Sequence, residues 1–290
     1  MSWKSIADLI GSEGEVALLG APMEAGSVTP GRCDLAPDTV RRALKRFSTY
    51  DVETGEELDV RVADFGDVPV QGVMPADGFA AVRDGAAAAV AGHGLTLLLG
   101  GNNAVTRPAA HALGLPLGKV GLITLDAHFD LRETDGGLMN GNPVRALLED
   151  GLPGRNICQI GLAPWANTGK MHRDALAAGI GVFTMADCVE RGIASVIESA
   201  VGRLLHTEAI MVDFDIDVIE RSQCPGAPGA RPGGMPAEMF FRAARRLAAQ
   251  PKVKLVDLTE FDPSLDVSDI TALTAGRWVC DILAGFSTRR

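Results

Sequence analysis

The sequence predicts an α/β protein of three layers, with helices on both faces of a central, mostly parallel sheet of about eight strands. Two observations lead to this prediction. Short apolar runs alternate with longer helical patterns, which is the order of βαβ units, and such units build parallel sheets. Several runs are hydrophobic on both faces, as expected of strands that helices cover from two sides. No linker or internal repeat interrupts this alternation, so residues 1–290 are predicted to form one domain.

Each predicted strand is a short apolar run with β-rich composition. In chain order the strands occupy residues 15–20, 61–66, 95–101, 119–127, 156–162, 179–185, 208–217 and 252–260. The longer stretches between and after these runs have helical patterns. In chain order the helices occupy residues 36–47, 78–93, 143–151, 170–179, 194–206, 236–250 and 269–286.

The composition excludes several classes of protein. Lys and Arg total 27 while Asp and Glu total 37, so the net charge is −10 and the sequence pI is near 5.0. An acidic chain is a poor partner for nucleic acid or an anionic membrane, and no apolar run approaches the roughly 20 residues that cross a bilayer. The five cysteines lack CxxC spacing and suggest neither a disulfide framework nor a zinc clip. We therefore expect a cytoplasmic protein that acts on a small molecule, without a nucleic-acid or membrane partner.

Polar segments follow three of the predicted strands. The segment GGNNA (100–104) ends one strand, DAHFD (126–130) ends the next, and DFDID (213–217) ends a later one. In an open parallel sheet, ligands bind at the carboxyl ends of the strands. The three segments therefore predict one shared site.

The spacing within two of these segments is typical of a metal site. Asp126, His128 and Asp130 alternate along an extended strand end and so face the same way, and Asp215 and Asp217 repeat this pattern. Carboxylates with one imidazole suit Mn²⁺ or a related ion better than structural zinc. Two divalent cations would balance four carboxylates and leave room for a bridging hydroxide. Any one of these aspartates alone is more typical of a helix cap or turn, so the prediction rests on the group.

At this point the chain resembles the ureohydrolases, the family of arginase, agmatinase and formimidoylglutamase. The resemblance runs through nearly the whole chain, in the segments GAPMEAGS (20–27), LLLGGNNA (97–104), LITLDAHFDLR (122–132), NGNPVRALLE (140–149), VDFDIDVIERSQCPGAPGARPGGM (212–235) and LVDLTEFDPSLD (255–266). It implies an arginase-like fold, a homo-oligomer, and two Mn²⁺ ions whose bridging hydroxide attacks a C=N carbon.

The resemblance also implies which residues hold the metals. The first ion would take Asp126, Asp130 and Asp215, together with the residue at position 103. The second would take Asp126, His128, Asp215 and Asp217, so that Asp126 and Asp215 bridge the two ions. By the same resemblance, Glu260 would hold the amidine or formimino nitrogen of the substrate.

Two residues depart from the usual family pattern. Asn103 stands where the family has a histidine ligand of the first metal, and a carboxamide oxygen is a weaker ligand. We therefore expect the first ion to bind weakly or to be absent. Asn140 stands where arginases and agmatinases have a histidine thought to carry protons to the leaving group. Asp130 is then a candidate catalytic residue, because it could pass a proton from the hydroxide to the departing amine.

The second departure is shared with formimidoylglutamases, which have a small polar residue at this position. They also tend to have DLR after the ligands, as in Asp130-Leu131-Arg132. Arg132 would suit a dicarboxylate substrate, because a guanidinium binds a carboxylate bidentately. We assign Arg132, Asn140, Arg231 and Glu260 as candidate substrate-binding residues; for Arg132 a surface ion pair with a nearby acid is an equal alternative, and for Arg231 an ordinary loop position is the simpler one.

The sequence therefore predicts a hydrolase acting on the C–N bond of a linear amidine. The first choice is N-formimidoyl-L-glutamate, converted to L-glutamate and formamide in histidine degradation. One alternative is a hydrolase of a guanidino compound, like agmatinase, arginase or a hydroxyarginase. Another is a ureohydrolase-like protein with weakened catalysis that acts as a binding protein, which Asn103 and Asn140 would explain.

Overall fold

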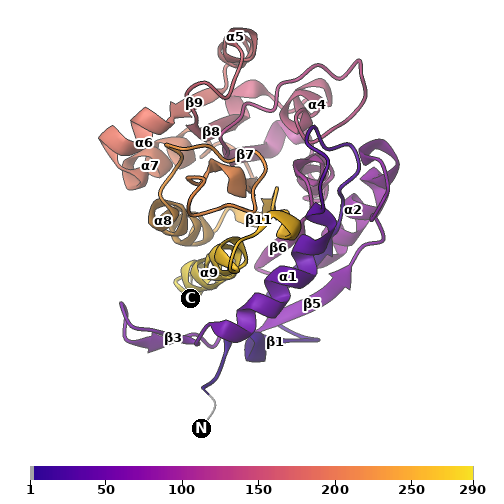
Figure 1. The fold of residues 1–290 in the computed structure, drawn as a ribbon. Coiled ribbons are helices and arrows are strands. Elements are labelled where there is room, and N and C mark those ends of the chain that lie inside the picture. The colour runs from indigo at the N-terminus through magenta and orange to yellow at the C-terminus, as the bar shows by residue number, and fades with distance from the viewer. Residues whose placement is uncertain (1–2, 290) are drawn as a thin grey trace.

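A computed structural model describes residues 3–289, in which nine parallel strands form the central sheet (Figure 1). The strand order is β1-β5-β2-β6-β11-β10-β7-β8-β9. The bounds are β1 Ile10–Gly11, β2 Val16–Ala21, β5 Val62–Asp67, β6 Leu95–Gly100, β7 Val120–Leu125, β8 Ile157–Leu162, β9 Gly181–Thr184, β10 Ala209–Asp215 and β11 Val253–Thr259. The interior strands are buried along nearly their whole length, which confirms the reading of their two-sided hydrophobicity.

Helices cover both faces of this sheet. They are α1 Ala36–Ala43, α2 Pro75–Val90, α3 Thr106–His111, α4 Pro143–Glu149, α5 Gly169–Ala178, α6 Met185–Arg191, α7 Ile193–Arg203, α8 Ala237–Ala248 and α9 Ile270–Ser287. One apolar core lies between the sheet and α1, α6, α7, α8 and α9, and a second lies between the sheet and α2, α3, α4 and α5. The predicted three-layer α/β/α class is therefore confirmed.

The structure adds elements that the hydrophobic pattern did not predict. The edge strand β1 and the hairpin of β3 (Tyr50–Asp51) with β4 (Glu56–Glu57) have only two residues per strand. Helix α6 starts at Met185, where a strand was expected to end. Its start is a capping box, in which Thr184 Oγ1 accepts from the Asp187 backbone N–H (3.2 Å) and the Asp187 carboxylate accepts from the Thr184 backbone N–H (2.8 Å).

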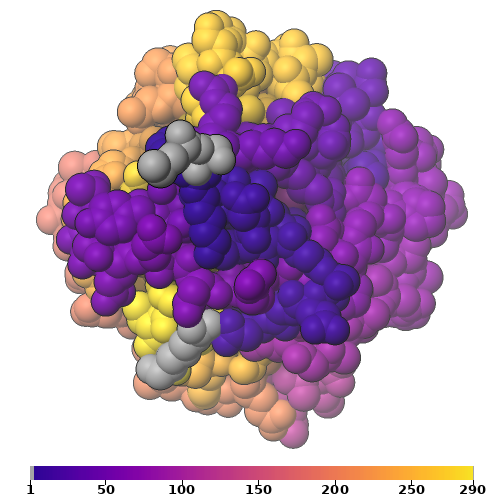
Figure 2. Space-filling view, turned by 90° about the horizontal axis from the view of Figure 1, so that it is seen from below, coloured from indigo at the N-terminus to yellow at the C-terminus, as the bar shows by residue number. Residues whose placement is uncertain are grey.

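N-terminal and C-terminal parts of the described chain lie on one face of the molecule. Figure 2 shows the indigo N-terminal segment beside yellow C-terminal residues on this face. The Arg289 guanidinium ties the C-terminal end to the sheet layer, donating to the backbone oxygens of Ala248 (2.6 Å), Gly94 (3.1 Å) and Val253 (3.0 Å). None of the helices within residues 3–289 is long and apolar enough to span a membrane.

Four neighbouring central strands position the candidate site. They lie in the order β6-β11-β10-β7; β6, β10 and β7 continue into the three polar segments discussed above, and β11 ends directly before Glu260. Parallel strands end at the same edge of the sheet, so this order brings together segments that are more than 150 residues apart in sequence, such as Asn103 and Glu260, whose contact spans 157 positions. The sequence predicted the strands, and the sheet order supplies the convergence.

Candidate metal centre

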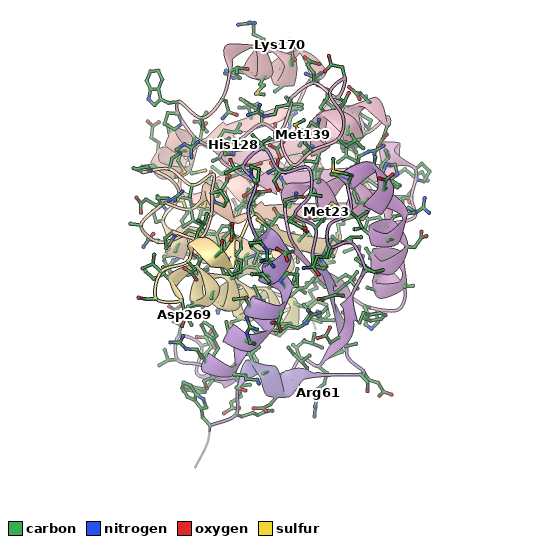
Figure 3. All side chains as sticks on the ribbon, turned by 45° about the vertical axis from the view of Figure 1, so that its right-hand side comes forward. Met23, Arg61, His128, Met139, Lys170 and Asp269 are labelled. Carbon is green, nitrogen blue, oxygen red and sulfur yellow. The ribbon has the colours of Figure 1, made fainter. Side chains whose placement is uncertain are left out.

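One cavity gathers most of the predicted site residues. It has a volume of about 140 Å³, and its wall includes His128, Asp130, Arg132, Asn140, Asp215, Asp217, Arg231 and Glu260. Asp126 and Asn103 lie directly behind this wall and are each 1% exposed. Figure 3 shows His128 within the body of the molecule, while Lys170, on α5, lies at its surface. All ten residues named from the sequence therefore belong to one region.

Asp126, His128 and Asp217, here called the imidazole half of the site, form a compact cluster. His128 Nδ1 lies 3.1 Å from Asp217 Oδ2 and 3.4 Å from Asp126 Oδ1. One potential ligand atom from each residue lies within 4.8 Å of the others. The backbone shapes the cluster, because the His128 N–H donates to Asp126 Oδ1 (2.6 Å).

The electrostatics of this half match a cation site. Burial, as the largest effect, raises the pKa of Asp126 to about 6, and Asp217 with the other partners raises the pKa of His128 to about 12. Within the described residues, Asp126 Oδ2 and Asp217 Oδ1 are buried without a hydrogen-bond partner. Buried carboxylate oxygens without donors are expensive. These two oxygens, beside an imidazole, are a donor set that a divalent transition-metal ion satisfies.

Asn103, Asp130 and Asp215, here called the amide half, are arranged differently. The Asn103 Nδ2 amide donates to Asp130 Oδ2 (2.7 Å), while its Oδ1 accepts from Thr106 Oγ1 (2.7 Å) and Thr259 Oγ1 (3.1 Å). In this orientation Asn103 offers an N–H to the site, whereas a metal ligand must offer its oxygen. The predicted ligand role of Asn103 thus stays a prediction that requires the amide to rotate.

The carboxyl groups of the amide half have strongly altered acidity. Burial, followed by the charge of Asp126, raises the pKa of Asp130 well above its usual value. Burial, followed by the charge of Asp217, does the same for Asp215. Within residues 3–289, no imidazole forms an ion pair with Asp130 or Asp215. Below it lie two further buried acids that sequence reasoning missed, Asp213 and Asp257, which are paired in register on β10 and β11.

Glu260 is held firmly at the end of β11. Its Oε1 accepts from the Asn103 backbone N–H (2.7 Å) and from Asn140 Nδ2 (2.9 Å). Burial, the largest effect, raises the pKa of Glu260 to about 7. Asn140 in turn accepts at Oδ1 from the Val28 backbone N–H (2.8 Å), so it links Glu260 to the N-terminal loop.

Two residues of this site have a strained backbone conformation. Asp130 has φ 51° and Glu260 has φ 62°, values in the left-handed region that side chains other than glycine rarely adopt. Such strain persists where the surrounding structure enforces it, and it clusters at functional sites. Gly229 is needed for another reason, because a Cβ there would lie 1.9 Å from Asp217 Oδ2. The glycine- and proline-rich loop 225–234 therefore packs directly on the metal ligands.

The two candidate arginines differ in their freedom to bind a ligand. Arg132 lines the cavity, and its guanidinium forms neither an ion pair nor a hydrogen bond with any residue between 3 and 289. Arg231 folds back on its own loop, where Nη1 donates to the Gly229 carbonyl oxygen (2.7 Å). Arg132 is thus the better placed of the two to bind a carboxylate.

Sequence reasoning missed several residues that complete the site. Asn167 was not assigned a role, yet its Oδ1 accepts from the Phe129 N–H and its Nδ2 donates to the Ala127 oxygen, both at 2.9 Å. It thereby holds the metal-ligand segment in place. Val28, Thr29 and Met171 also line the cavity, and nothing in their residue types indicates this.

Comparison with known proteins agrees with this geometry. The model of the arginase family matches residues 14–285. A formimidoylglutamase of Halalkalibacterium halodurans is 32% identical over 276 residues, which cover 92% of this chain and 86% of that protein. A guanidinopropionase of Pseudomonas aeruginosa is 28% identical over 93% of this chain and 86% of its own length. The crystal structure of Bacillus subtilis formimidoylglutamase matches with a TM-score of 0.92 at 29% identity, over 98% of this chain and 92% of that one.

The fold and the site define an α/β protein with a candidate metal centre at the carboxyl edge of a parallel sheet. The chain belongs to the arginase family of metal-dependent ureohydrolases, which act on linear amidines.

Proposed function

We propose that this chain is a manganese-dependent hydrolase that converts N-formimidoyl-L-glutamate and water to L-glutamate and formamide. The observation that carries the proposal is the pairing of an acidic metal centre with arginine side chains in one small cavity. Formimidoylglutamases among the relatives, at 32% and 29% identity, support the choice of substrate.

The residues present fit two manganese ions. The imidazole half would hold one ion with Asp126, His128 and Asp217, and the amide half would hold the other, with Asp126 and Asp215 shared. Carboxylate and imidazole ligands suit Mn²⁺. When bound, such ions lower the pKa of water and make it a nucleophile at neutral pH. The unpartnered oxygens of Asp126 and Asp217 are the atoms this interpretation explains.

The charges of the cavity select the kind of substrate. Apart from the acids of the metal centre and Glu260, the charged groups on the described cavity wall are Arg132 and Arg231. A cationic tail, such as that of agmatine, would meet these arginines with like charge. A glutamate moiety has two carboxylates, and Arg132 can bind one of them bidentately.

The remaining steps use Glu260 and Asp130. The Glu260 carboxylate receives an N–H of the cationic formimino group and orients its carbon. After water adds to that carbon, the bond to the glutamate nitrogen breaks, and the nitrogen must gain a proton to leave as an amine. Asp130 faces the same cavity, so it is the group we assign to take a proton from the adding water and pass it to this nitrogen.

A second candidate function is hydrolysis of a guanidino acid. The guanidinopropionase relative, at 28% identity, supports it, and a substrate with a single carboxylate would need only Arg132. The weakened binding protein remains the third candidate, because Asn103 presents an N–H to the amide half.

One assay separates these candidates. Protein loaded with Mn²⁺ is incubated with formimidoylglutamate and with a panel of guanidino acids, and formamide, ammonia, urea and bound manganese are measured. Formamide from formimidoylglutamate supports the proposal. Urea from a guanidino acid alone would support the second candidate, and no turnover by a chain that binds no metal would support the third.

A further inference from the structure

The carboxylate of Glu260 presents its two oxygens unequally. Oε1 accepts two hydrogen bonds, from the Asn103 backbone N–H at 2.7 Å and from Asn140 Nδ2 at 2.9 Å. A carboxylate oxygen has about two lone-pair positions, so both are occupied. Oε2 has no hydrogen-bond partner within residues 3–289, and Glu260 lines the cavity. One oxygen therefore remains for a substrate.

Asn140 cannot easily leave this arrangement. Its Oδ1 accepts from the Val28 backbone N–H at 2.8 Å, and its own backbone N–H donates to the Gly26 carbonyl oxygen at 3.2 Å. The loop that carries Gly26 and Val28 is further held by Asn102, whose Nδ2 donates to the Ala25 oxygen (2.9 Å) and Ser27 Oγ (2.8 Å). Asn140 is thus fixed on both sides, with one amide hydrogen on Glu260.

We infer that Asn140 is a specificity-determining residue, which occupies Glu260 Oε1 so that the site accepts an amidine with a C–H in preference to a guanidine. The inference rests on the proposed function and deepens it. Asn140 acts through Glu260 and so is a positioning residue, whereas Glu260 itself contacts the substrate.

The physical reason is a count of hydrogen-bond donors. A protonated N-formimidoyl group has an NH₂ and an N–H on a carbon that carries hydrogen. The matching N-amidino group has a second NH₂ in place of that hydrogen. One free Glu260 oxygen can receive one N–H, so the second NH₂ of the guanidine finds no second position on Glu260. Buried donors left without partners are strongly disfavoured, and enzymes use such losses to discriminate between similar substrates.

Removal of the Asn140 side chain should free Oε1. Glu260 could then accept two parallel N–H bonds from a guanidinium, as carboxylates do. The Asn140→Ala change should therefore improve binding of the guanidine more than binding of the formimidoyl compound. Asn140→Asp keeps an acceptor for the Val28 N–H and removes the donor to Glu260, so it should shift the preference in the same direction.

The test uses N-formimidoyl-L-glutamate and N-amidino-L-glutamate, which differ only at this carbon. Calorimetry on the full chain without manganese, in which the compounds are not consumed, gives the Kd of each compound, and steady-state kinetics on the Mn²⁺-loaded chain gives KM and kcat separately. We expect wild type to prefer the formimidoyl compound, and the ratio of the two Kd values to fall about tenfold in Asn140→Ala and in Asn140→Asp.

Ser27→Ala is the matched control. It removes one of the two contacts of Asn102 with the same loop and leaves Glu260 untouched, so the Kd ratio should stay at the wild-type value. An equal fall in this control would assign the effect to loop movement and overturn the inference. An unchanged ratio in both Asn140 variants, with circular dichroism showing them folded, would also overturn it. Failure of wild type to hydrolyse formimidoylglutamate would instead count against the proposed function, since the Kd ratio does not depend on turnover.

Discussion

The imidazole half and the amide half of the candidate metal centre lie side by side at one sheet edge, yet they are organised differently. In the imidazole half, His128 stands between Asp126 and Asp217, and the three ligand atoms already converge without an ion. In the amide half, Asn103 donates an N–H to Asp130, and two hydroxyl groups hold its oxygen away from the site. The first arrangement is preformed for a cation, whereas the second must rearrange to accept one.

The difference shows how strongly one residue type can change the charge balance of a site that contains several carboxyl groups. An imidazole can carry a proton and balance two neighbouring carboxylates, and it can later exchange that proton for a metal ion. A carboxamide has no charge to offer, and burial raises the pKa of Asp130 and Asp215 well above the usual value, which favours their neutral forms. We therefore expect the two halves to bind manganese with different affinities.

The largest effect is expected from the change Asp217→Asn in the imidazole half. It removes the strongest partner of His128 and one buried ligand oxygen, so the more tightly held ion should be lost. Activity should fall by at least about 1000-fold. Manganese per chain, measured by plasma mass spectrometry, checks the first expectation. Glu238→Gln, which removes an exposed carboxylate on α8, is the control and should change neither value. Full retention of the tight ion in Asp217→Asn would mean that the halves are assigned wrongly.

The next effect concerns pH. Folding raises the pKa of His128 from 6.5 to about 12, chiefly through Asp217. The imidazolium therefore stabilises the metal-free fold fully below pH 6.5, and this contribution is lost only as the pH rises through about 12. Between pH 6 and 8 the first manganese ion must displace this proton.

Release of at least one proton per ion predicts that affinity rises about tenfold per pH unit, or roughly 100-fold from pH 6 to 8. Calorimetric titration in buffers of different ionisation enthalpy measures both the affinity and the number of protons released. A pH-independent affinity for the first equivalent of manganese would show that His128 is already neutral in the metal-free protein, and the contrast between the halves would lose its electrostatic basis.

The sequence predicted the buried strands well, because they depend on local patterns, and it named residues that the structure brings to one cavity. Two-sided apolar runs identified the buried strands, and the alternating acids of 126–130 and 213–217 identified the imidazole half. Elements with little apolar pattern were not predicted. Examples are the two-residue strand β1 and helix α6, whose sequence signal is the capping residue Thr184. Strand order could not be predicted either, because it is set by packing between distant segments.

The orientations of the Asn103 and Asn140 side-chain amides could not be predicted from the sequence either. Asn103 and Asn140 could be named as departures from the family pattern, but the orientation of an amide depends on which donors and acceptors the fold brings beside it. For Asn103 these include Thr259 from β11, and for Asn140 they include the Val28 backbone from the N-terminal loop. Those partners are more than 100 positions away in sequence, and no local pattern connects them.

The smallest of these effects is expected from Asn103→His, which makes the amide half resemble the imidazole half. An imidazole is a stronger metal ligand than a carboxamide. The imidazole nitrogen that faces Asp130 can lose its proton when a metal ion binds, whereas the Asn103 amide N–H cannot. The affinity for the second equivalent of manganese should rise by roughly tenfold, while that for the first stays unchanged. Calorimetry resolves the two equivalents, and Thr106→Ser, which preserves the hydroxyl beside Asn103, serves as the control for disturbance of the pocket. If Asn103→His leaves the second affinity at the wild-type value, residue 103 lies outside the metal shell, and the asymmetry between the halves must come from the carboxylates alone.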